Sequence, residues 1–239
     1  MIVRCLRTDE KEHTTKIYAM SDIHGQSQPF EEALELVDFS KGNQLVLCGD
    51  YIDHRYLNDW IYCDIFDLQQ SHPEQVIVLM GNTDYIYLHD FQPFSSIADT
   101  KQRNEMKRWL ENLPNFYETD NQIFVHAGID EEAGDFWELG ASDEFFREKF
   151  PPTKGYFSKD IIAGHVGTSS PYLSNDANYH EVYWDGASHY YLDGTTERSG
   201  IVPVLEYDVE SGRYFHYPLI EDRSSSGRRV RMPVEASLV

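Results

Sequence analysis

Three apolar runs in this 239-residue chain end directly on polar residues that can bind metal ions. Residues 16–20 lead into Ser-Asp-Ile-His, residues 44–48 into Gly-Asp, and residues 76–80 into Gly-Asn. Short runs rich in Val, Ile and Leu are typical of strands buried on both faces, as in parallel sheets. Because ligands bind beyond the carboxyl ends of such strands in open α/β sheets, we expect the residues after these runs to form one site.

Helical patterns separate these runs, which favours a parallel sheet with helices as crossovers. Apolar residues recur at helical spacing in 28–39, 56–73 and 101–114, and two further strands are predicted at 121–128 and 160–167. From about residue 179 the pattern changes to alternation, with Asp-Gly and Ser-Gly steps that predict antiparallel hairpins. We therefore expect a mostly parallel first half followed by an antiparallel second half.

Composition limits the classes of partner. The chain has 20 Lys and Arg against 41 Asp and Glu, a formal charge of −21, which argues against nucleic-acid or acidic-membrane partners. No apolar run approaches the ~20 residues needed to span a bilayer, and the N-terminus has no apolar segment of the kind found in signal peptides. The three cysteines are scattered, which fits a reducing compartment. We expect a soluble cytoplasmic protein.

The strand ends carry a mixed set of metal-type donors. A single histidine at a strand end is more often structural than a ligand, but here five strand ends repeat the pattern. Carboxylate, imidazole and amide donors together suit Mn, Fe or Zn better than Ca or Mg. Six ligands from this set would already be too many for one structural zinc and suit two metals that share a carboxylate. The candidate donors are Asp22, His24, Asp50, Asp53, Asn82, His126 and His165.

Five motifs, at 22–25, 49–53, 81–84, 126–129 and 164–168, read DIHG, GDYID, GNTD, HAGI and GHVGT. They resemble, in family order, the five blocks of the calcineurin-like metallophosphoesterases. The nearest group is the bacterial phosphoprotein-phosphatase type, which includes symmetrical dinucleotide-tetraphosphate hydrolases. The resemblance implies an α/β fold, a four-layer αββα sandwich with mixed sheets. We expect one such domain over residues 1–220 and a mobile Ser- and Arg-rich tail over 221–239.

The resemblance also implies the role of each donor. Asp22 and His24 would hold a first divalent ion, Asp50 would bridge two ions, and a second ion would be held by Asn82, His126 and His165. Manganese is the first expectation, with Fe, Zn or Co as alternatives. A metal-bridging hydroxide would attack the phosphorus of the substrate, while Asp53 would orient a ligand or fix its loop.

The substrate expected from this resemblance is a small phosphorylated molecule or a nucleotide with a good leaving group. A serine/threonine phosphoprotein is the alternative substrate. A weakly active regulatory protein that binds metal and phosphate is an alternative of another class.

Two positions depart from the family pattern. The family usually has Asp-Arg-Gly after the bridging carboxylate, with the arginine on phosphate, whereas this chain has Asp53-His54-Arg55. Arg55 could reach the phosphate from one position later, His54 could take that role, or both could face solvent.

The second departure is Thr83, because the family usually has histidine after the metal-binding asparagine. A threonine hydroxyl is a far weaker acid than imidazolium, so the chain should favour leaving groups that need little protonation. His54 is a candidate substitute for the missing imidazole. Asp84 either serves the active site or is a first-turn carboxylate of the following helix.

Overall fold

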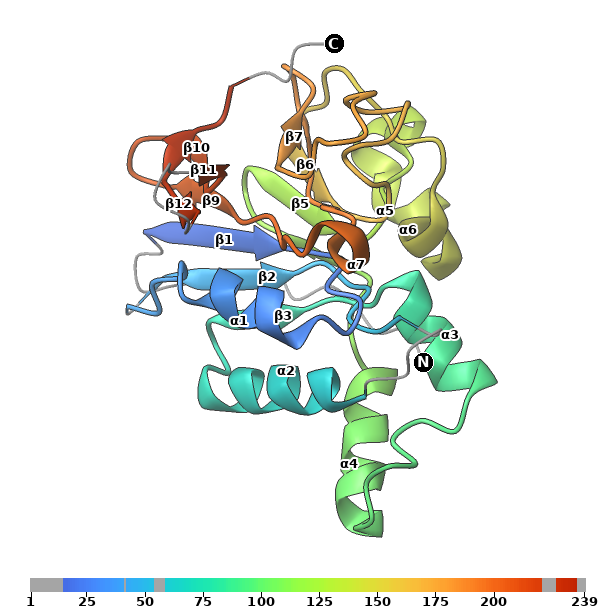
Figure 1. Ribbon diagram of the computed structural model, residues 1–239. Coiled ribbons are helices and arrows are strands. Elements are labelled where there is room, and N and C mark those ends of the chain that lie inside the picture. Colours follow the sequence, from blue (N-terminus) through green and yellow to red (C-terminus); the bar gives the residue numbers. More distant parts are fainter. Residues whose placement is uncertain (1–14, 41, 54–58, 221–226, 236–239) are drawn as a thin grey trace.

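Two mixed sheets stack face to face in the computed structural model, which describes residues 15–40, 42–53, 59–220 and 227–235 (Figure 1). The first sheet has the order β13-β10-β9-β1-β2-β3 and the second β4-β5-β6-β8-β7. In the first sheet, β1 (Lys16–Met20), β2 (Gln44–Leu47) and β3 (Val76–Val78) are parallel, while β9 (Leu205–Asp208) runs antiparallel to β1. The second sheet contains β5 (Gln122–Val125) and β6 (Asp160–Ala163), which are parallel.

Side chains on alternate positions of the strands fill three apolar layers. Between the sheets, Ile17, Ala19 and Val46 pack with Phe124 and Ile162. The opposite face of the first sheet is covered by α1 (Ser27–Leu34), α2 (Trp60–Ser71) and α4 (Thr100–Glu111). The outer face of the second sheet packs under α5 (Trp137–Gly140) and α6 (Asp143–Glu148), as Figure 1 shows. The predicted four-layer αββα sandwich is confirmed.

The remaining elements are short. They are α3 (Asn82–Asp90), a 3₁₀ helix η1 (Glu131–Phe136), α7 (Thr196–Ser199), β4 (Phe116–Glu118), β7 (Tyr183–Trp184), β8 (His189–Tyr191), β10 (Arg213–His216), β11 (Leu219–Ile220), β12 (Arg228–Arg229) and β13 (Met232–Pro233). Among the helices in the described ranges, none combines the length and apolar character needed to cross a membrane.

The predicted antiparallel second half is present, with one exception. β7 pairs antiparallel with β8, and β9 pairs antiparallel with β10. On its other side, however, β8 runs parallel to β6, in register Ile162 opposite Tyr190. The carboxyl end of β8 therefore lies at the same edge of its sheet as the ends of β5 and β6, so its following residues reach the same region.

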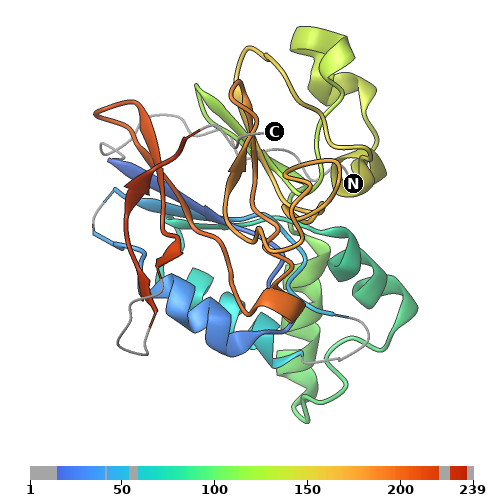
Figure 2. The same cartoon turned by 45° about the horizontal axis from the view of Figure 1, so that its top comes forward.

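Residues 227–235 fall within the predicted tail and are paired with the rest of the domain. β12 pairs with β11, and β13 pairs with β10 (Figure 2). Between these strands, Arg231 Nη2 donates to Glu206 Oε1 at 2.7 Å, and its Nε lies 3.1 Å from Oε2. Glu206 is fully buried and also faces Lys16 Nζ at 3.3 Å. The segment after residue 226 thus completes the partners of a buried carboxylate.

We predict that Arg231→Ala lowers the free energy of unfolding by about 1–3 kcal/mol, because it removes hydrogen bonds to a buried charge while Lys16 remains. Urea unfolding measures the change. The exposed neighbour Arg228, substituted in the same way, is the matched control. Equal stability of the two variants would contradict the role given to the Arg231–Glu206 pair.

Candidate metal centre

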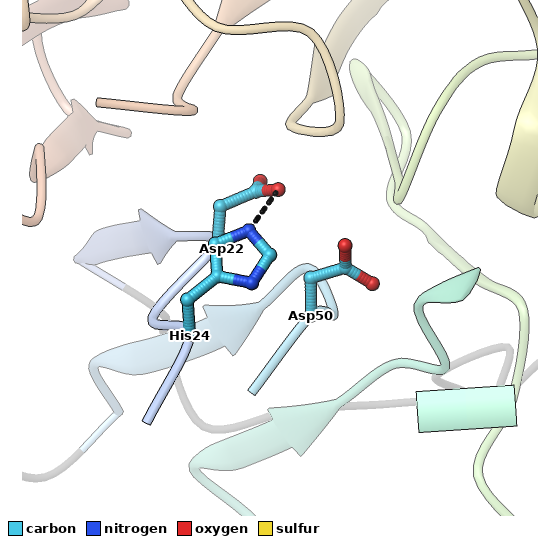
Figure 3. Close-up of side chains that lie close together, drawn as sticks. All are labelled: Asp22, His24 and Asp50. Carbon is cyan, nitrogen blue, oxygen red and sulfur yellow. Dashed lines mark ion pairs between the residues drawn. The ribbon is translucent and has the colours of Figure 1, made fainter. Parts of the chain in front are cut away.

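The loops after β1 and β2 bring three of the predicted ligands together. Asp22, His24 and Asp50 each offer a ligand atom, and these atoms lie within 4.8 Å of one another (Figure 3). Both carboxylates are buried, and His24 Nε2 lies 3.6 Å from Asp22 Oδ1. Backbone hydrogen bonds join the loops, since Asp22 N donates to the Gly49 carbonyl and His24 N to the Asp50 carbonyl. These three side chains form a candidate site for a metal ion.

Three further predicted ligands converge from the ends of β3, β5 and β6. Asn82 Oδ1 lies 2.9 Å from His126 Nε2 and 3.2 Å from His165 Nδ1. His126 Nε2 is also 3.3 Å from Asp50 Oδ1. Asp50 therefore lies between the two groups of side chains.

The surroundings of the Asn82 amide oxygen indicate whether this donor set suits a cation. Its oxygen faces two imidazole nitrogens, and it lies 3.1 and 3.2 Å from the two carboxylate oxygens of Asp50. Oxygens at these distances repel one another unless a cation lies among them or the amide turns so that its nitrogen donates. Carboxylate, imidazole and amide lone pairs directed at one region are the donors that divalent transition metals accept. The residues present fit such an ion.

The backbone at the centre is unusual in the same places. Asp22, His24, Asp50 and His165 all have positive φ, between 50° and 66°. Residues other than glycine rarely adopt this left-handed conformation, and those that do cluster at functional sites where surrounding contacts hold them. Four such residues in one cluster indicate that the loops are shaped for the site rather than for the sheets.

Glycines beside the candidate ligands allow the loops to approach closely. A Cβ on Gly81 would lie 2.2 Å from the backbone nitrogen of Asp50. One on Gly164 would lie 2.0 Å from Asp22 Oδ2. Any side chain at these two positions would push the strand ends apart, so the glycines of the predicted motifs have a direct steric role.

Hydrogen bonding sets which ring nitrogen of His126 faces the centre. Nδ1 donates to the Cys48 carbonyl at 2.9 Å, which leaves the Nε2 lone pair directed at Asp50 and Asn82. A carbonyl on the outer nitrogen is the common arrangement for metal-binding histidines, because it fixes both the ring and its tautomer. The imidazole is thus prepared to donate a lone pair.

The charges at the centre call for a cation. Burial alone would raise the pKa of Asp22, but hydrogen bonding to His24 and the charge of His126 lower it. Burial would lower the pKa of His24, yet Asp22 and Asp50 raise it to about 10. At His165, burial and the charge of His126 lower the pKa. Two buried carboxylates thus favour positive charge, which a divalent ion supplies while the imidazoles stay neutral.

Asp84 acts on the backbone of the site. It is the third residue of α3 and is fully buried, and one of its oxygens accepts from Asp50 N at 2.8 Å and Gly81 N at 2.9 Å. The other accepts from Tyr51 N at 3.0 Å and Tyr62 Oη at 2.7 Å. Burial and the nearby Asp50 charge raise the pKa of Asp84 to about 6. These contacts match the first-turn alternative, and they also hold the Asp50 loop against the start of α3.

Thr83 lies next to Asp50. Its backbone N donates to Asp50 Oδ1 at 2.9 Å, and its side-chain hydroxyl is buried without a hydrogen-bond partner among the residues described. Asp53 is also buried in the loop after β2. The other two candidates, His54 and Arg55, lie outside the described residues.

Two further buried residues, Asp193 and Arg147, fall outside the sequence motifs. Asp193 follows β8 and is buried, its Oδ1 accepts from Thr195 N at 2.7 Å, and burial and the Asp22 charge raise its pKa well above the usual range. Asp193 follows an apolar run, as Asp50 and Asn82 do, but the sequence does not show that this run pairs in parallel with residues 160–163. The second, Arg147, lies in a helical pattern that gives no such indication.

Arg147 is a buried arginine beside the loop that carries His126. Its Nη1 donates to Asn115 Oδ1 at 2.7 Å, and its guanidinium carbon lies 4.2 Å from the centre of the Tyr85 ring. The preceding residue, Phe146, accepts a backbone hydrogen bond from Ala127. Nε is buried and has no partner among the described residues. An unsatisfied buried donor on a charged side chain is uncommon in folded proteins.

Comparison with known families identifies the class of protein. Residues 15–201 match the family described as calcineurin-like phosphoesterase, and the chain belongs to it. The resemblance drawn from the five motifs is thus confirmed.

Individual relatives are more distant. The chain is 28% identical over 122 residues to a symmetrical bis(5′-nucleosyl)-tetraphosphatase of Methylobacillus flagellatus, covering 47% of this chain and 43% of that protein. The chain therefore spans less than half the length of this curated relative. A cold-active protein-tyrosine phosphatase of a psychrophilic Shewanella has a similar structure, with a TM-score of 0.62, 16% identity and coverage of 90% of this chain and 81% of that one. A putative diadenosine tetraphosphatase gives a TM-score of 0.56 at 18% identity, covering 86% and 94%.

We predict that Asp50→Asn loses at least one bound metal ion per chain and most activity, because two cations would then share less negative charge between them. Elemental analysis after dialysis measures the metal content, and Asp120→Asn, at an exposed turn, is the control. Two tightly held ions in the Asp50 variant would exclude the bridging role.

Proposed function

We propose that this protein is a phosphoester hydrolase that uses two divalent metal ions and acts on nucleotides or small phosphorylated molecules with good leaving groups. The observation that carries the proposal is the convergence of five donor side chains, from the ends of β1, β3, β5 and β6, around the carboxylate of Asp50. Membership of the calcineurin-like phosphoesterase family supports the reaction class.

Each donor then has a role. Asp22 and His24 would hold one ion, Asn82, His126 and His165 the other, and Asp50 both. When bound, such a pair of ions lowers the pKa of a water molecule and neutralises charge on phosphoryl oxygens. Asp84 fixes the backbone of Asp50, and the Cys48 carbonyl orients His126. Manganese remains our first expectation, and the donor types also admit Fe, Zn or Co.

An arginine would hold the substrate phosphate. Arg55 keeps the assignment that the family resemblance gives it. A guanidinium binds phosphoryl oxygens through charge-assisted hydrogen bonds.

Thr83 limits which leaving groups a substrate can have. Its hydroxyl cannot protonate a leaving oxygen near neutral pH as imidazolium does, so leaving groups that depart as anions are favoured. Nucleoside phosphates and aryl oxides meet this condition, whereas the alkoxides of phosphoserine and sugar phosphates do not. The curated relative is named as a nucleosyl tetraphosphatase, whose substrate contains phosphoanhydride bonds. Phosphoprotein therefore remains the alternative substrate.

The test is a turnover assay with added Mn²⁺ on diadenosine tetraphosphate, p-nitrophenyl phosphate and O-phosphoserine. We expect turnover of the first two, its loss with chelator and in Asp50→Asn, and little turnover of phosphoserine. Absence of turnover on all three would contradict the proposal and favour a regulatory protein that binds metal and phosphate.

We predict that Thr83→His raises kcat/KM for alkyl phosphates by about 10²-fold or more. The same substitution should raise kcat/KM for aryl phosphates much less, because general acid catalysis contributes on the order of 10²–10⁴-fold where the leaving group is poor. The ratio of the two gains is the measurement. Thr83→Val, which keeps the shape of the side chain, is the control and should leave aryl turnover unchanged. Equal gains on both substrates would refute the leaving-group argument.

A further inference from the structure

Two aromatic side chains form an exposed pair on the second sheet's side of the molecule. The rings of Phe150 and Tyr172 meet edge to face, with centroids 4.8 Å apart and planes at 76°. Both remain about half exposed, Phe150 at 56% and Tyr172 at 51%. Single exposed apolar residues need no explanation, but a paired set keeps aromatic surface open to a ligand.

Phe150 is attached to the loop that carries His126. It follows α6, and the stem of the preceding Lys149 packs on that loop, since a Cβ on Gly128 would lie 2.6 Å from Lys149 Cδ. The backbone N of Ala127 also donates to the Phe146 carbonyl at 2.9 Å. A movement of the His126 loop would therefore move the start of the Phe150 segment.

Tyr172 belongs to the loop that carries His165. Ser170 N donates to the Gly167 carbonyl at 2.8 Å, and Leu173 N donates to the Ser170 carbonyl at 3.0 Å, so the chain turns back on itself around this tyrosine. The Phe150–Tyr172 pair thus joins the loops after β5 and β6, the same two strand ends that supply imidazoles to the centre.

Side-chain contacts hold both segments in place. Lys149 Nζ lies 2.8 Å from Glu131 Oε1, and both of these side chains are largely buried. Lys154 Nζ donates to the Leu173 carbonyl at 3.3 Å, which ties the segment after Phe150 to the turn at Tyr172. The two rings are therefore presented by a framework that is already ordered, which reduces the entropy lost when a ligand binds.

We propose that the Phe150–Tyr172 pair binds the nucleobase of a nucleotide whose phosphates reach the metal centre. Resting on the proposed function, this assigns nucleotides as the substrate class. A flat π-system is the ligand that such a pair accepts by stacking, and stacking tolerates any base. No charged group is needed for it, which suits a strongly acidic protein with a formal charge of −21.

Equilibrium binding measurements separate the contribution of the base from that of the phosphates. Calorimetry on the Mn²⁺-loaded protein compares adenosine diphosphate with inorganic pyrophosphate, which has the same phosphates without the base. We expect the wild type to bind adenosine diphosphate more tightly. Phe150→Ala and Tyr172→Ala should each weaken that binding by about tenfold, the size of one lost base–aromatic stack, and leave pyrophosphate unchanged. Tyr156→Ala is the matched control, since this tyrosine is 88% exposed and precedes β6 at the opposite edge of the sheet.

The outcomes are distinct from those of the turnover assay. Equal affinity of the wild type for the two ligands, no binding of adenosine diphosphate, or an unchanged preference in both variants would overturn the proposal. Loss of pyrophosphate binding in the variants would also overturn it, because the rings would then affect binding of the phosphates at the metal centre and not binding of the base. Turnover of aryl phosphate alone, with no preference for the base, would leave the hydrolase intact and refute only the nucleobase site.

Discussion

The carboxylate of Asp50 is the point on which the centre depends. It accepts a hydrogen bond from the backbone N of Thr83. His126 lies on one side of it, and Asp22 and His24 lie on the other. The backbone N of Asp50 donates to the carboxylate of Asp84. Both sheets contribute to this arrangement, so the site requires the sandwich. The ends of β1, β2 and β3 supply four of the side chains, and the ends of β5 and β6 supply the two imidazoles of His126 and His165.

Such a centre is costly without a cation. Buried carboxylates lose their hydration and repel one another, and four residues in the left-handed conformation add strain. Raised protonation of His24 offsets part of this cost, and a divalent ion offsets more because it satisfies several lone pairs at once. The strand ends are therefore less stable than the strands that lead into them, and metal binding should stabilise the folded chain as a whole.

Much of this could be predicted from the sequence because parallel strands place their carboxyl ends together. The rule located the donor residues from Asp22 to His165 without knowledge of any contact. It did not reveal the parallel pairing of β8 with β6. Alternation and turn residues predict hairpins between strands that are consecutive in sequence, but they do not predict which distant strand pairs on the other side. Asp193 was missed for this reason. The backbone role of Asp84 and the burial of Arg147 depend on packing between helices that a local pattern does not show.

Anomalous diffraction from crystals grown with Mn²⁺ would show whether two cations share the Asp50 carboxylate. We expect two peaks about 3.5–4 Å apart, both within bonding distance of Asp50, with the amide oxygen of Asn82 directed at one of them. A single peak held by Asp22, His24 and Asp50, with the Asn82 amide nitrogen donating to the Asp50 carboxylate, would contradict it.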